Sequence, residues 1–491
     1  MEATSPAGRC RRRVRNVVAG IALVVATLAI GLVLARAGQP AELPPPARPL
    51  PPPVHGAFAT GGVPVRDAAL HELLAGDLME FVQAVDRHKP PPPELRAVLE
   101  RAEPIRAHGP ALAASWRALL GWLDHWVVDG SGRDLQAKVH AVSDQLAAAG
   151  LGYFLEGDIM FHAGRAHVFV FAYRVEDVRF LHVMGLPRRV LSLRRIDRVN
   201  LMHNELGLQS EELGDPVVLL DQIDQHVVHR TLPVLAPDAR YDLDDDVDPE
   251  MRELALAAGA AIRGELRAAL GRDAEPAAAV ARLLAERARI LAAHRFRVDE
   301  LLLPPDTLQK LAPGLADGEA ERLAAIDGEL VEGNAVELAW HCRDVIAASV
   351  RRHEAQHGID GERAEPLRYP DALAQLVHNE RARAELAAYL SQIANDPVTP
   401  RYALWNVLRF AFEVRMMGSA ESYAAVVIAT GLARELGIPS AGPIVKDGVF
   451  DRVPLVRIAR PLAAVSGERL RAAARALWQT LYREPLIPIV D

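Results

Sequence analysis

Several residue types that mark common protein classes are scarce in this chain of 491 residues. Two cysteines, Cys10 and Cys342, are too few for a disulfide framework. Aromatic residues make up only 5%, so binding of bases or sugars by aromatic stacking is not expected. The formal net charge is -8 and no extended basic run lies beyond the N-terminus, so nucleic acid is not expected as a partner.

Hydrophobic residues are plentiful by comparison. They make up 50% of the sequence, against 24% charged residues, which is enough to bury a sizeable core. The length predicts roughly two to four domains. Alanine, leucine and arginine are abundant and favour helix, and no repeat at a solenoid period is present.

An uncharged apolar segment lies close to the N-terminus. Residues 17–35 approach the length needed to cross the roughly 30 Å hydrocarbon core of a bilayer. Arginines concentrate in residues 1–16, which predicts a cytoplasmic N-terminus and a single-pass anchor. The alternative is a cleaved signal peptide, because residues 35–37 resemble a small-x-small cleavage site. We expect a cell-membrane protein whose bulk is extracytoplasmic, either periplasmic or extracellular, after a proline-rich linker at 36–58.

The remaining chain divides into two predicted domains. Residues 59–245 begin with helical patterns, and β-branched and aromatic runs within 151–200 predict a small antiparallel sheet. Glu176-Asp177 lies between two such runs and is predicted to form a hairpin turn. Helical patterns dominate residues 246–491. The expected fold is mainly α with a small antiparallel β region, in the α+β class.

The most informative motif is HEAQH at residues 353–357, which matches HExxH. On a helix, His353 and His357 differ by about 40° in direction, so both imidazoles face one point. Both also share the apolar side of the predicted helix with Ile346 and Val350. Glu354 points about 100° away from its neighbour, where it can reach a metal-bound water without binding the metal. We expect the helix to end at Gly358.

Two imidazoles leave a zinc site one protein ligand short. The next strong helical pattern covers residues 378–394, with an apolar face that includes Leu386. Glu385 lies beside that face and is the better candidate for the third ligand. Glu380 lies on the far side and is the alternative, and His378 is a third choice.

With these residues, the sequence resembles the gluzincins, zinc metallopeptidases in which HExxH is followed by a glutamate on a downstream helix. The resemblance covers residues 335–395 in detail. It implies a helical zincin-like catalytic domain with a Zn²⁺ cofactor. It carries over His353, His357 and Glu385 as zinc ligands and Glu354 as general base.

The second signature of many gluzincins, NExxxD, is only partly matched. Asn379-Glu380 matches its start, but Ala384 stands at the position of the aspartate. Glu380 therefore stays open as a ligand. Three residues are candidates for the donor that stabilises the oxyanion: His378, Tyr389 and Tyr423.

The resemblance implies a membrane-anchored, extracytoplasmic metallopeptidase that hydrolyses peptide bonds through a zinc-activated water, with a protein or peptide substrate. The alternative function is a non-catalytic envelope binding or scaffold protein that carries a structural or vestigial zinc site.

Overall fold

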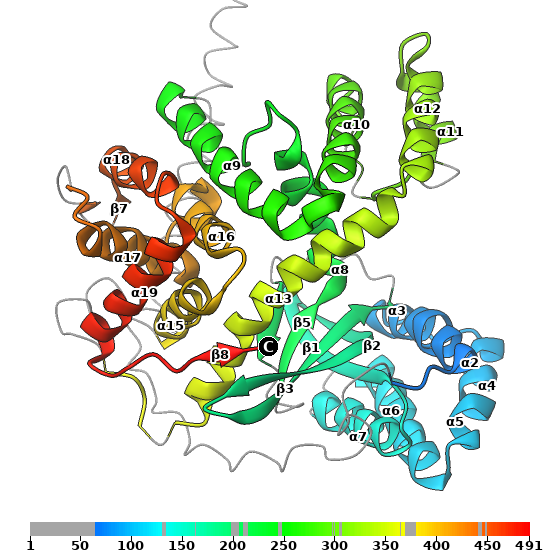
Figure 1. The fold of residues 1–491 in the computed structure, drawn as a ribbon. Coiled ribbons are helices and arrows are strands. Elements are labelled where there is room, and N and C mark those ends of the chain that lie inside the picture. The colour runs from blue at the N-terminus through cyan, green and yellow to red at the C-terminus, as the bar shows by residue number, and fades with distance from the viewer. Residues whose placement is uncertain are drawn as a thin grey trace, which may run out of the picture. The chain divides into compact units, whose positions relative to one another are not determined.

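Helices account for most of the fold, and one small mixed sheet interrupts them (Figure 1). This computed structural model describes residues 64–491 apart from 130–133, 163, 198–205, 210–214, 244–247, 297, 299, 304–306, 364, 369–379, 440–443 and 447–448. The predicted class, mainly α with a small β region, is confirmed at this level.

The helices before the sheet are α2 (Ala68–Glu72), α3 (Leu78–Asp86), α4 (Pro93–Arg101), α5 (Glu103–Ala107), α6 (Pro110–Asp129) and α7 (Leu135–Ala148). Those after its main strands begin with α8 (Leu220–His226), α9 (Pro249–Leu270), α10 (Ala274–Ala293), α11 (Thr307–Leu311), α12 (Glu319–Glu332) and α13 (Ala335–Gly361). They continue with α15 (Glu380–Asn395), α16 (Pro400–Phe412), α17 (Ala420–Glu435), α18 (Arg452–Ala463) and α19 (Gly467–Tyr482).

The strands of the main sheet are β1 (Tyr153–His162), β2 (Arg165–Val183), β3 (Leu186–Arg195), β4 (Gly207–Gln209), β5 (Pro216–Leu219) and β8 (Ile489–Val490). Their order is β1-β2-β3-β5-β4, and β8 pairs with the end of β2. A separate small hairpin joins β6 (Val445–Lys446) to β7 (Val449–Phe450).

The sheet is mixed, which corrects the prediction of an antiparallel one. Strands β3 and β5 run parallel, whereas β1–β2, β2–β3 and β4–β5 are antiparallel. Parallel neighbours need a connection of about a dozen residues or more, because the chain must return to the same end of the sheet. Residues 196–215 provide that length between β3 and β5.

The prediction of a hairpin turn at Glu176-Asp177 is wrong. Strand β2 continues through both residues, and its pairing with β3 shifts register between Val175 and Asp177, as at a β-bulge. The turn lies instead at Met184-Gly185, where φ is 54° and 78°. A two-residue hairpin turn with positive φ at both positions matches the right-handed twist of the strands, which explains this location.

Strand β2 alternates between two hydrophobic cores. Val168 and Val170 pack with helices α2–α7, whereas Phe171 and Tyr173 belong to a core on the other face with β3 and β5. A third and larger core joins the helices from α8 to α19. Val218 of β5 belongs to this third core as well. The core therefore contains residues from both sides of the domain boundary predicted at 245/246. That boundary stays a prediction, and the residues on both sides of it fall within one compact unit, residues 52–491.

The expected membrane anchor needs correction. Among the residues described in the structure, no helix combines the length and apolar character needed to cross a bilayer. The longest of these helices, α13, carries charged side chains such as Arg343, Asp344 and Arg351, which are costly in hydrocarbon. This finding contradicts the predicted single-pass location. Residues 17–35, on which that prediction depended, lie outside the described residues.

Candidate metal centre

Helix α13 carries the HExxH residues and lies between the sheet and helix α15. It contacts β4 and β5 on one side and α15 on another (Figure 1). The predicted helix end at Gly358 is wrong, because α13 continues to Gly361 and the amide of Glu362 donates to the carbonyl of Gly358. Gly358 does not adopt a positive φ, so it does not act as a left-handed cap.

Three contacts set the register between α13 and α15. The Gln392 amide donates to Ser349 Oγ at 3.0 Å, the rings of Tyr389 and His353 lie 4.3 Å apart between centroids, and His357 faces Glu385. As residue numbers rise on α13 they fall on α15, so the two helices run antiparallel. This register places the carboxylate of Glu385 opposite both histidines.

The ligand atoms of His353, His357 and Glu385 lie within 4.8 Å of one another. The two Nε2 atoms are 3.1 Å apart, and the Glu385 carboxylate oxygens lie 3.6 Å from His353 Nε2 and 3.9 Å from His357 Nε2. Tetrahedral ligands at about 2.1 Å from zinc are separated by about 3.4 Å. The three side chains are therefore spaced as zinc ligands would be.

Burial controls the charges of this cluster. It lowers the pKa of His353 to about 3 and that of His357 to about 4, so both imidazoles are neutral at neutral pH and have a lone pair for a metal. Burial also raises the pKa of Glu385, and this effect outweighs the opposing effects of His357 and Arg381. His353 Nδ1 is buried without a hydrogen-bond partner among the described residues. A divalent cation would compensate the carboxylate, so the donor set fits zinc.

Glu354 is buried beside this cluster, with an exposed fraction of 4%. Its Oε1 lies 4.0 Å from His353 Nε2, so a small molecule held beside His353 would also contact Glu354. The same carboxylate lies against Gly207 in β4, where an added Cβ would come within 2.6 Å of Oε1. Only glycine allows this close approach between β4 and α13.

The other predicted site residues have different positions. Glu380 is exposed at the start of α15, outside the cluster that Glu385 forms with His353 and His357. His378 lies outside the described residues. Burial holds the pKa of Tyr389 well above its usual range, so its hydroxyl stays protonated and able to donate, whereas Tyr423 packs its ring on Phe450.

Sequence reasoning missed two residues that shape this site. Gly207 belongs to a strand of three residues, which is too short to give a periodic pattern. Gln392 is a buried polar residue seven positions after Glu385, on the same side of α15, and this spacing is the signal that could have indicated a contact with α13.

Searches against protein-family models, curated proteins and solved structures find no match to this chain.

Proposed function

We propose that the protein is a zinc-dependent metallopeptidase of gluzincin type, with His353, His357 and Glu385 as the zinc ligands. The observation that carries the proposal is the convergence of these three donors from two helices. Each is largely buried, and the two imidazoles are neutral at neutral pH. Crowding three donors in this way is costly in an apolar setting unless a cation binds them.

Bound zinc would polarise the scissile carbonyl and lower the pKa of a water molecule toward neutrality. Glu354 would accept the proton of the attacking water and return it to the leaving amine. Its burial beside His353 and its contact with Gly207 hold the carboxylate in position for this transfer. Of the proposed oxyanion donors, we favour Tyr389, because its ring packs on His353 and its hydroxyl is protonated.

The test is the Glu354→Gln variant, assayed on an unstructured polypeptide such as casein. Loss of the general base should lower the hydrolysis rate by roughly 10²- to 10⁴-fold. Zinc content should stay at the wild-type level, because Glu354 is not a ligand. The matched control is Glu380→Gln, which changes an exposed glutamate and should leave both readouts unchanged.

The outcomes separate the two functions. Wild-type activity in Glu354→Gln would rule out the peptidase mechanism. Zinc bound by the wild type without hydrolysis of any peptide substrate would favour the non-catalytic scaffold instead.

A further inference from the structure

A second polar site lies on a different face of α13, away from the histidines. It is a cavity of about 770 Å³ between strands β2 and β3, helix α8 and helix α13. This volume is in the range of sites for small organic ligands. Of the described residues, six arginines line this arginine cavity: Arg66, Arg174, Arg179, Arg194, Arg343 and Arg351. Four carboxylates accompany them: Glu176, Asp177, Asp224 and Asp344.

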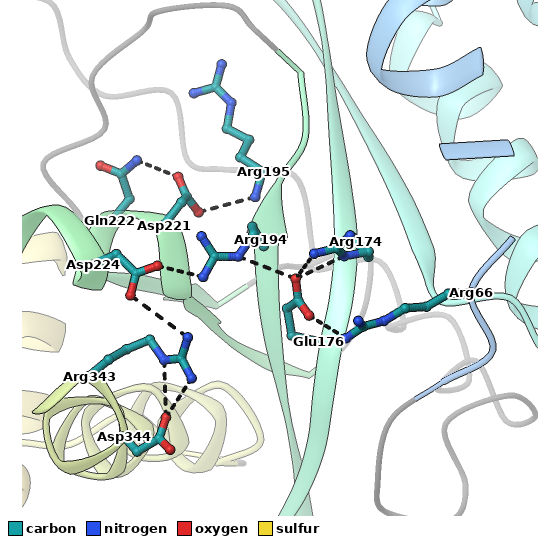
Figure 2. A network of polar contacts seen from close by, with 10 residues as sticks. All are labelled: Arg66, Arg174, Glu176, Arg194, Arg195, Asp221, Gln222, Asp224, Arg343 and Asp344. Carbon is teal, nitrogen blue, oxygen red and sulfur yellow. Dashed lines mark hydrogen bonds and ion pairs between the residues drawn. The ribbon is translucent and has the colours of Figure 1, made fainter. Parts of the chain in front are cut away.

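The carboxylates are shared between arginines, as Figure 2 shows. Glu176 accepts from Arg66 at 2.5 Å and from Arg174 at 2.9 and 2.5 Å, and Arg194 lies 3.4 Å away. Asp224 accepts from Arg194 at 2.6 Å and lies 4.0 Å from Arg343. The six arginines thus share four carboxylates, so the lining has an excess of positive charge.

Arg351 is where this excess is least compensated. Within the described part of the chain it forms no hydrogen bond or ion pair, and its Nε is buried. The negative charges that act on it belong to Asp177 and Asp491. Each of these already pairs with another arginine, Arg179 and Arg352 respectively. A partly buried guanidinium without a partner is unfavourable, so an external anion would stabilise it.

The rim of the cavity is apolar on one side. Trp340 lines it with 48% of its surface exposed, and the guanidinium of Arg343 lies 5.7 Å from the ring centroid. An exposed tryptophan next to a cationic cavity suits a ligand with an anionic group and an apolar or planar part. Guanidinium groups match the geometry of phosphate oxygens, to which they donate in pairs.

We propose that the arginine cavity binds a small phosphate ester, with the phosphate group against Arg351 and the organic part against Trp340.

The test uses calorimetric titration of the full-length chain with phenyl phosphate and with inorganic phosphate, at low ionic strength. Both should bind, and phenyl phosphate should bind more tightly because its ring contacts Trp340. Arg351→Gln should weaken both ligands by about tenfold or more, as expected for loss of a charged hydrogen-bond partner. The matched control Arg272→Gln changes an arginine whose side chain is 97% exposed outside the cavity, and it should bind as the wild type does.

Further variants separate the two halves of the proposal. Trp340→Ala should reduce the affinity for phenyl phosphate to that for inorganic phosphate. If Arg351→Gln does not fold, Arg179→Gln removes a mostly exposed positive charge from the same lining and should also weaken both ligands. Binding must persist when a chelator is present, because phosphate held by a metal ion at the histidines would then be lost.

Three results would overturn phosphate binding in the arginine cavity altogether. These are no binding of either ligand, wild-type affinity in Arg351→Gln, and loss of binding with the chelator. Equal affinity for the two ligands would identify free phosphate as the ligand and overturn the ester.

Discussion

Helix α13 presents two polar faces that handle charge in opposite ways. On the metal-centre face, burial leaves His353 and His357 neutral and raises the pKa of the Glu385 carboxylate in spite of the nearby positive charge of Arg381. On the face of the arginine cavity, fixed charges of both signs are paired, and Arg351 is the exception. The first face therefore calls for a cation and the second for an anion. One helix can support both because side chains a few residues apart point in different directions.

The largest effect should come from removing the carboxylate of the metal-centre face. Glu385→Ala removes one of three proposed protein ligands, so zinc content should fall from one per chain to near zero after dialysis. Elemental analysis of the purified protein measures this. Glu380→Ala removes the same group from the same helix at an exposed position and should keep its zinc. Equal loss in both variants, or in neither, would contradict the ligand assignment.

Glu265 is a second buried carboxylate, away from the histidines, and it serves as a comparison for Glu385 in the metal centre. Glu265 accepts the amides of Arg401 and Tyr402 at the start of α16, and burial raises its pKa to about 7 from 4.5. The folded state then holds its proton to higher pH than the unfolded state, so the free energy of unfolding should fall as the pH rises from about 4.5 to 7. The shift corresponds to about 3 kcal/mol.

Glu265→Gln cannot titrate and should flatten this pH dependence, as measured by urea denaturation at several pH values. Zinc content should not change, because no histidine lies beside Glu265 in its described contacts. An unchanged slope would show that Glu265 ionises normally in the folded protein.

A smaller effect is expected at the contact between the sheet and the metal-centre face. Gly207→Ala places a Cβ within 2.6 Å of both Glu354 Oε1 and the carbonyl oxygen of Val217. We expect a loss of about 1–3 kcal/mol in the free energy of unfolding, together with slower hydrolysis, because Glu354 must move. Gly264→Ala in α9 is the control: its Cβ meets nothing within 4 Å and should stabilise the helix by about 0.5–1 kcal/mol. Equal stability of the two variants would mean that β4 does not constrain Glu354.

The sequence was informative wherever a periodic pattern extended over several turns. The spacing of His353 and His357 predicts that they face one point, and the position of Glu385 beside the apolar face of its helix predicts that it approaches them. Both expectations agree with the observed cluster, although metal binding itself stays a prediction. A single periodic segment contains this information because it depends only on the geometry of one helix.

The hairpin prediction that was wrong and the features that the sequence did not reveal all depend on contacts between segments far apart in the chain. Glu176-Asp177 has the composition of a turn, but pairing with β3 keeps it in a continuous strand with a bulge. The approach of Gly207 to Glu354 joins residues far apart in sequence, and no local pattern marks it. The cavity around Arg351 likewise depends on how strands and helices from separate parts of the chain come together.

Because α13 and α15 pack antiparallel in one register, the site depends on the spacing of residues within each helix. It does not depend on the length of the chain that connects the two helices. One residue inserted within either helix, between its contact positions, would rotate everything beyond it by about 100° and separate Ser349–Gln392 from His357–Glu385. Residues added to the chain between the two helices change no phase at all. Related chains could therefore vary widely in that connection and keep the same arrangement of donors, so a search for relatives should fix the spacing inside each helix and leave the spacing between them free.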